Sequence, residues 1–122
     1  MAAKPSRSQL RKKLKTVFSK VVRRVGICQR CGFSTVRYLQ CSHIRSKKAH
    51  PRLEFDLDNV LSMCQKCHIY WWHKEPYEAI EWFEKEFPDQ AKRLREKVLN
   101  EMSLPKPDLE GLLEKYEKLL AE

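Results

Sequence analysis

Acidic residues are missing from the first 53 positions of this 122-residue chain, which hold fifteen lysines or arginines. Glu54 is the first acid, and from Pro76 onward the balance reverses to twelve acids against eight bases. Cationic side chains that displace counterions from phosphates supply most of the sequence-independent affinity for nucleic acids. We therefore expect the N-terminal half to meet a polyanionic partner. For the first few residues alone, a solvated basic tail is the alternative interpretation.

The sequence also lacks any apolar run near the roughly 20 residues that a membrane-spanning helix needs, so we expect no membrane-embedded segment. Its five cysteines are odd in number and no apolar signal region leads the chain, which favours reduced thiols and a cytoplasmic location over disulfides. A chain of this size builds only a modest hydrophobic core. Bound metal is therefore an expected additional source of stability.

Apolar residues recur every three or four positions from Leu10 to Val25, which predicts an amphipathic helix with a basic opposite face and Ser6 or Ser8 as its cap. Such a helix either docks on the domain and presents its charge to phosphates or lies on a membrane surface. The last segment has leucines at helical spacing and either packs back or mediates self-association, so a homodimer through the terminal helices is one expectation. We divide the chain into a basic arm (1–25), a central core (26–75) and a helical extension (76–122).

Four of the cysteines form two C-x-x-C pairs, Cys28 with Cys31 and Cys64 with Cys67, and 32 residues separate the pairs. A two-residue spacer lets both thiolates of a pair bind one ion, and four thiolates complete the tetrahedral coordination of Zn²⁺. Because such a site has no open position, we expect this zinc to be structural. A redox-active pair fits poorly, since two pairs are present without a βαβ pattern. Cys41 is left over and is interpreted as a buried thiol.

Between the cysteine pairs, TVRYLQCSHI (35–44) is rich in β-branched and aromatic residues and predicts a short strand that ends near His43. A basic loop follows over 45–52, and LEFDLDNVLSMC (53–64) predicts a second extended segment or turn. A helix should follow the second cysteine pair and end before Pro76, which opens the next helix. The predicted fold class is a small α+β domain with N- and C-terminal helices.

A histidine, an asparagine and a histidine follow one another in this region: His43 in CSHI, Asn59 in DLDNVLSMC and His68 in CQKCHIYWWH. This order, combined with two C-x-x-C pairs, resembles the HNH motif of the ββα-metal, or His-Me finger, endonucleases. The resemblance is closest to a subset with many phage-encoded members and covers roughly residues 27–74. It implies a treble-clef-like ββα-metal core, a DNA substrate and, for a phage protein, the host cytoplasm as its location.

The resemblance also implies a role for each member of the motif. His43 is the expected general base that takes a proton from water, and imidazole, which titrates near pH 6.5, suits that task. Asn59 is expected to hold the loop that orients His43. His68 is expected to bind a catalytic Mg²⁺ or Mn²⁺, which stabilises the charge on the leaving oxygen in a single-metal hydrolysis.

Two positions depart from the family pattern. Many relatives carry an acid or histidine ligand just before the base, where this chain has Ser42, whose hydroxyl is a weak ligand. Where relatives have a second helix ligand, it stands four residues after the first, and here that place is Trp72. His73 lies about 140° from His68 around an α-helix, so we expect it to be a co-ligand only where the helix bends or ends early.

The loop after the expected base carries four cations that would contact DNA phosphates without reading sequence: Arg45, Lys47, Lys48 and Arg52. The aromatic residues that follow are expected to form core rather than platforms for stacked bases: Trp71, Trp72, Trp82 and Phe83. Besides a metal-dependent DNA endonuclease, two other functions fit the sequence. One is a zinc-stabilised nucleic-acid-binding module that never cuts, favoured by Ser42, and the other is an assembly factor that recruits proteins through its C-terminal helices.

Overall fold

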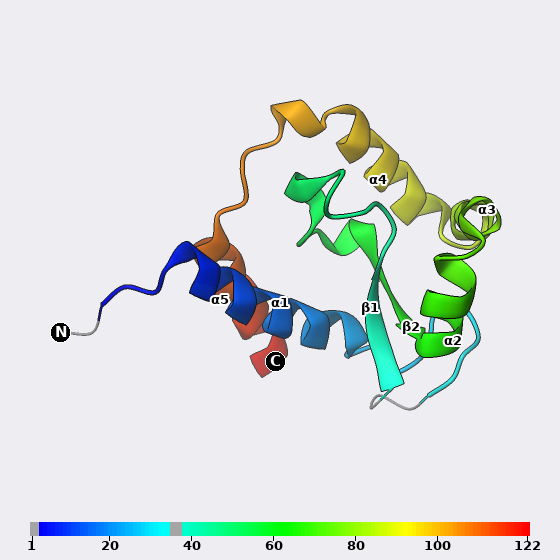
Figure 1. Ribbon diagram of the computed structural model, residues 1–122, viewed down its shortest axis with the longest axis horizontal. Helices are drawn as coiled ribbons and strands as arrows, with labels where there is room; N and C mark the ends of the chain where they lie inside the picture. The colour runs from blue at the N-terminus through cyan, green and yellow to red at the C-terminus, as the bar shows by residue number, and fades with distance from the viewer. Residues whose placement is uncertain (1–2, 35–37) are drawn as a thin grey trace.

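A two-stranded antiparallel sheet lies among helices in the computed structural model, which describes residues 3–34 and 38–122 (Figure 1). The principal elements are α1 (Arg7–Arg23), β1 (Leu39–His43), β2 (Val60–Cys64), α2 (Gln65–Cys67), η4 (His68–Trp72), α3 (Pro76–Glu86), α4 (Pro88–Leu99) and α5 (Leu109–Ala121). Three short 3₁₀ turns join them: η2 (Pro51–Leu53), η3 (Leu57–Asn59) and η5 (Glu101–Ser103). The predicted α+β class is confirmed. No described helix is both long and apolar enough to cross a membrane.

The register of the sheet brings the motif residues together. Leu39 pairs with Cys64 at one end of the hairpin, and His43 pairs with Val60 at the other. The end of β1 that carries His43 therefore lies beside the residue that follows Asn59. The strand predicted from the β-branched stretch is confirmed from Leu39 onward, and the earlier residues 35–37 lie outside the described part of the chain.

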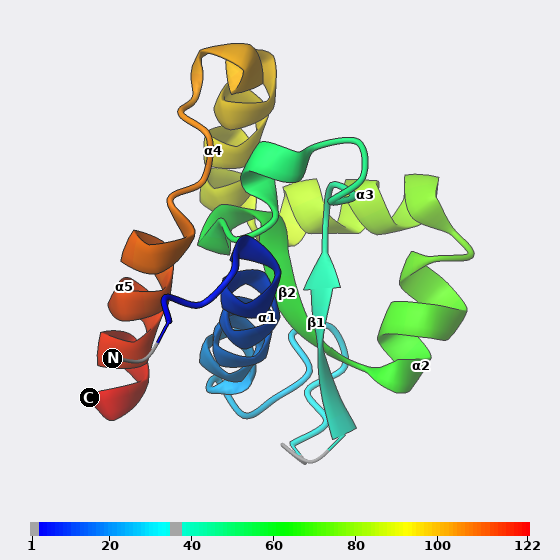
Figure 2. The same ribbon diagram turned by 60° about the vertical axis from the view of Figure 1, so that its left-hand side comes forward.

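Helices α1 and α5 pack together on one side of the sheet, and α2 and α3 lie on the other side (Figure 2). Ser6 caps α1 by accepting a hydrogen bond from the backbone N–H of Gln9. Below this cap, Leu14 and Phe18 are buried in a core that they share with α5 and with Phe55. The apolar stripes of the two terminal helices are thus covered within one chain, which accounts for both stripes without a second copy.

On the other side of the sheet, aromatic side chains fill the main core. Trp71 and Trp72 are buried, and they meet Trp82 and Phe83 of α3 edge to face, with ring centroids 5.4 Å and 6.4 Å apart respectively. Such edge-to-face contacts add to the stabilisation that burial itself provides. These rings are therefore core, as expected, and Pro76 begins α3 at its first position.

The segment after the second cysteine pair differs from the single α-helix that we expected. Three residues form α2, and the chain then widens into the π-helical turn η4. The backbone N–H of His73 donates to the carbonyl of His68 at 3.1 Å, five residues back rather than four. A π turn holds one more residue than an α turn, and such turns are frequent at functional sites. It brings His73 back above His68.

Candidate functional site

The two C-x-x-C pairs form one cluster near the end of the sheet where β1 begins and β2 ends. The sulfur atoms of Cys28, Cys31, Cys64 and Cys67 all lie within 4.8 Å of one another. Those of Cys31 and Cys64 are 3.7 Å apart. Four thiolates at Zn–S bonds of about 2.3 Å have sulfurs roughly 3.8 Å apart in a tetrahedron. The predicted arrangement of four cysteines is confirmed, and its donor set and spacing fit zinc.

The backbone around the first pair explains how the cluster forms. The N–H of Gly32 donates to the carbonyl of Cys28 at 2.9 Å, and the N–H of Cys28 donates to that of Phe33 at 2.7 Å. Gly32 has φ of +81°, a conformation that favours glycine, so the chain turns directly after Cys31 without strain. The N–H of Gln29 donates to the carbonyl of Ser62, which ties this turn to β2.

Cys41 takes no part in the cluster. Its side chain is half-buried in β1, and burial raises the pKa of the thiol to about 12, so it remains protonated at neutral pH. A protonated thiol is a poor nucleophile and a poor metal ligand. Cys41 is thus a packing residue, in keeping with its interpretation from the sequence.

A hollow of about 640 Å³ lies between α1 and η4, against the end of β1. Three histidines that are far apart in the sequence line it: His43, His68 and His73. Lys15 from α1 and Lys47 from the loop after β1 line the same hollow. The structure therefore gathers imidazole and ammonium groups around one space large enough for a small anionic group.

A backbone hydrogen bond defines which ring nitrogen of His43 carries the proton. Its Nε2 lies 2.8 Å from the backbone oxygen of Glu54. Because a carbonyl only accepts hydrogen bonds, Nε2 carries the proton, and Nδ1 of the neutral ring keeps the free lone pair. Burial lowers the pKa of His43, the charges of Lys47 and Lys15 act in the same direction, and Glu54 opposes them. At neutral pH the ring is thus an unprotonated base.

Asn59 fixes the loop that follows His43. Its side chain is fully buried, and its Oδ1 accepts from the backbone N–H of Arg45 at 2.7 Å. Its Nδ2 donates to the carbonyls of Arg45 and Leu53, both at 3.0 Å. Ile44 donates in turn from its backbone N–H to the carbonyl of Asn59 at 2.8 Å. One amide therefore joins the two ends of the loop beside His43.

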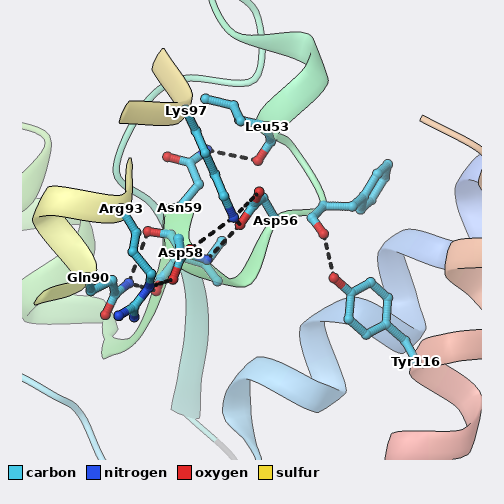
Figure 3. Close-up of polar contacts among 10 residues, drawn as sticks. Leu53, Asp56, Asp58, Asn59, Gln90, Arg93, Lys97 and Tyr116 are labelled. Carbon is cyan, nitrogen blue, oxygen red and sulfur yellow. Dashed lines mark hydrogen bonds and ion pairs between the residues drawn. The ribbon is translucent and has the colours of Figure 1, made fainter. Parts of the chain in front are cut away.

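Helix α4 in turn holds the segment that carries Asn59 (Figure 3). Lys97 reaches the carboxylates of Asp56 and Asp58 at 2.8 Å and 2.9 Å, and Arg93 meets Asp58 at 3.0 Å. Burial disfavours the ionised form of Asp58, but these cations outweigh it and lower its pKa. The two aspartates thus serve a structural ion-pair network that anchors η3 to α4.

His68 and His73 form a close pair across the π turn, with ring centroids 4.7 Å apart. Nδ1 of His68 lies 2.8 Å from Oε1 of Gln40, an acceptor, so Nδ1 carries the proton and Nε2 keeps the lone pair. Burial, with the charges of His73 and His43, lowers the pKa of His68 to about 4. Metal-binding histidines commonly donate their other ring N–H to such an acceptor. Nε2 of His68, which lies beside the ring of His73, is therefore available to a metal ion.

Ser42, by contrast, does not reach this site. It is 1% exposed and is not among the residues that line the hollow. Adjacent side chains of a strand point to opposite faces, so Ser42 turns away where His43 faces inward. The weak-ligand role that the sequence suggested for Ser42 has no support in this geometry.

Three of the four cations of the basic loop are exposed, and the fourth is hydrogen-bonded within the protein. Arg45, Lys47 and Lys48 are exposed. Arg52 instead donates from one guanidinium nitrogen to the carbonyls of Glu101, Met102 and Leu104, at 2.7 Å to 3.0 Å. These bonds hold the segment between α4 and α5, so Arg52 is a structural residue and we leave it out of the candidate DNA contacts.

Sequence reasoning missed Gln40 and Glu54, and it placed Lys15 on the basic face of the N-terminal helix without bringing it to the histidines. Lys15 stands beside the buried Leu14 in a helix that we had treated as a separate arm, and no local pattern shows which partner that helix packs on. Gln40 and the backbone of Glu54 act through single hydrogen bonds to distant histidines. No sequence pattern marks such contacts, because they depend on how distant segments pack.

One comparison with known proteins matched the part of the chain that holds most of these residues. The family model described as HNH endonuclease matches residues 28–69, a stretch that contains the four clustered cysteines, His43, Asn59 and His68. His73 and Lys15 lie outside it. No curated protein and no solved structure matched the chain. Residues 28–69 of this chain thus match the HNH endonuclease family, and four cysteines within this stretch are positioned for a zinc site.

Proposed function

We propose that this protein is a metal-dependent endonuclease that hydrolyses phosphodiester bonds of DNA. The observation that carries the proposal is the convergence of His43, His68 and His73 on one hollow beside exposed cations. A base, a pair of metal-binding nitrogens and positive charge for phosphates are the groups that hydrolysis of a phosphodiester requires.

His43 is the proposed general base. The carbonyl of Glu54 fixes its tautomer so that Nδ1 keeps the free lone pair, and the hydrogen bonds of Asn59 hold the neighbouring loop. Nδ1 takes the proton from the attacking water. Base catalysis of this type typically contributes about 10²- to 10⁴-fold to the rate.

His68 and His73 are the proposed ligands of the catalytic ion. Nε2 of His68 keeps its lone pair because Gln40 accepts the proton of Nδ1, and the π turn brings the His73 ring to a centroid distance of 4.7 Å from the His68 ring. When bound, a divalent ion there would stabilise the negative charge that develops on the leaving oxygen. The two donors are imidazoles, so we expect Mn²⁺ to bind better than Mg²⁺, which prefers oxygen ligands.

The zinc that the four cysteines are proposed to bind would serve the fold. Held by these cysteines, it would join the turn before β1 to the end of β2 and to α2, the elements that lead into His43 and His68. Arg30 supports this corner by stacking on Trp71, 3.6 Å from the ring centroid, and by donating to the sulfur of Cys67 at 3.5 Å. Loss of this ion would therefore displace the whole site.

Cleavage of supercoiled plasmid tests the proposal. Zinc-loaded protein should nick or linearise DNA with Mn²⁺ or Mg²⁺ but not without an added ion, and His43→Ala should abolish cleavage. His50→Ala is the matched control, because His50 pairs with Glu101 outside the hollow. Cleavage that survives in His43→Ala would exclude His43 as the base.

Titration of Mn²⁺ by electron paramagnetic resonance tests the metal site independently of cleavage. In a His43→Ala background, His68→Ala and His73→Ala should each weaken Mn²⁺ binding. Binding that depends on His68 alone would remove His73 from the ligand set. DNA binding without cleavage under any metal would instead favour the non-catalytic zinc-stabilised module.

A further inference from the structure

Helix α1 forms one wall of the histidine hollow. Leu14 and Phe18 anchor the helix in the core that it shares with α5, and Phe18 also lines the hollow. Between them, Lys15 is exposed and lines the same space. A residue from outside the matched HNH segment therefore stands beside His43.

Lys15 and Lys47 bring two ammonium groups close together at this wall. Their mutual contact is the main cause of a lowered pKa for Lys15, and both cations act to lower the pKa of His43. Among the described residues, neither has a carboxylate within ion-pair distance. Glu54, the acid whose charge Lys15 senses, is itself buried and paired with Arg11. The two charges thus repel each other without a protein counterion.

An anion between the two ammonium groups would relieve this repulsion, because like charges in close contact are each stabilised by a shared opposite charge. The hollow is lined by His43, by His68 and His73 at the two ends of the π turn, and by Lys15 of α1 and Lys47 of the loop after β1. A DNA strand whose scissile phosphate meets the histidines would carry a neighbouring phosphate toward the lysines.

We infer that Lys15 of α1 and Lys47 of the loop after β1 together bind one backbone phosphate of the DNA, next to the phosphate that is cut. The inference rests on the proposed function for the identity of the ligand. It gives α1 a direct part in substrate binding and makes the basic N-terminal helix a wall of the site.

DNA binding without cleavage tests the inference, measured by fluorescence anisotropy of a labelled duplex over a salt series. All variants carry His43→Ala and structural zinc, and no divalent ion is added. Lys15→Ala and Lys47→Ala should each weaken binding roughly three- to fivefold. Lys13→Ala, an exposed lysine of the same helix that lines no part of the hollow, should leave the affinity unchanged.

The slope of log affinity against log salt then reports whether one phosphate is shared. The double variant of Lys15 and Lys47 should reduce the slope by about one, whereas two separate phosphate contacts would reduce it by about two. Lys15→Arg should retain the affinity. An equal loss in Lys13→Ala, no loss in Lys15→Ala, or a slope change near two would each overturn the inference.

Failure of the phosphate site can be distinguished from failure of the proposed nuclease activity. A protein that fails to cut plasmid but loses affinity through Lys15 and Lys47 would keep the phosphate site and lose the catalytic assignment. A protein that cuts normally but binds DNA independently of Lys15 would keep the catalytic assignment and lose the phosphate site. Thermal melting of every variant confirms that the exposed lysines were removed without loss of fold.

Discussion

Replacing Asn59 by alanine should destabilise the protein far more than loss of one polar side chain normally does. The side chain is fully buried and makes three hydrogen bonds to the backbone of Arg45 and Leu53. Alanine would leave one N–H and two carbonyl groups without these partners. At about 1 kcal/mol for each group, the lower end of the usual range, the loss of stability is about 3 kcal/mol.

This loss can be expressed as a melting temperature. An unfolding entropy of about 2.1 cal/mol/K per residue gives roughly 0.26 kcal/mol/K for the 122 residues. A change of about 3 kcal/mol therefore lowers Tm by about 12 °C. Near-ultraviolet circular dichroism would follow the melt, since the clustered tryptophans report the tertiary core.

Asn100→Ala is the matched control for Asn59→Ala. Asn100 is exposed, and its Nδ2 donates at 2.8 Å to the carbonyl of Glu96 at the end of α4. We expect this control to change stability by no more than about 0.5 kcal/mol, as surface substitutions usually do. If both variants melted at the same temperature, the role assigned to Asn59 in the loop would be wrong.

The loss of Asn59 should also slow DNA cleavage, because the loop that it joins follows His43 directly. At a temperature where Asn59→Ala is folded, kcat for plasmid nicking should fall while KM for DNA changes little, since Asn59 positions the base and contacts no substrate. Asn59→Asp should behave similarly, because a carboxylate cannot donate to the two carbonyls. A fall in affinity with an unchanged kcat would contradict a positioning role.

Two further predictions concern metal and pH. Cys67→Ser should lower the zinc content measured by atomic absorption and abolish the cooperative melt, because binding to the four-thiolate cluster is expected to supply folding energy; a cooperative melt of zinc-free Cys67→Ser would refute it. Cleavage should persist below pH 6.5 and fall only at lower pH, because burial lowers the pKa of His43 and the ring acts as a base only while neutral. A cleavage rate that already falls with decreasing pH above pH 6.5 would count against His43 as the base. The lowered pKa also means that His43 of the unfolded chain is protonated at a higher pH than in the folded protein. Protonation of His43 should therefore reduce the free energy of unfolding as the pH falls below 6.5.

Local features of this protein could be predicted from the sequence because their causes are local. A two-residue spacer places two thiols on one ion, so both C-x-x-C pairs were identified before any fold was known. Ser6 caps α1 and Pro76 begins α3 for the same reason. The order of His43, Asn59 and His68 likewise pointed to the HNH family that the matched segment confirms.

Tertiary structure alone decided which side chains share the site. Only the π turn, which forms where two adjacent tryptophans enter the core, brings His73 over His68. Packing of α1 against the sheet and α5 brings Lys15 to the hollow, and the carbonyls after α4 occupy Arg52. The sequence by itself determined the two cysteine pairs, the starts of α1 and α3 and the order of the HNH motif, since these depend on neighbours along the chain. Proximity between distant segments depends on how their apolar faces pack, and that is settled only when the whole core is assembled.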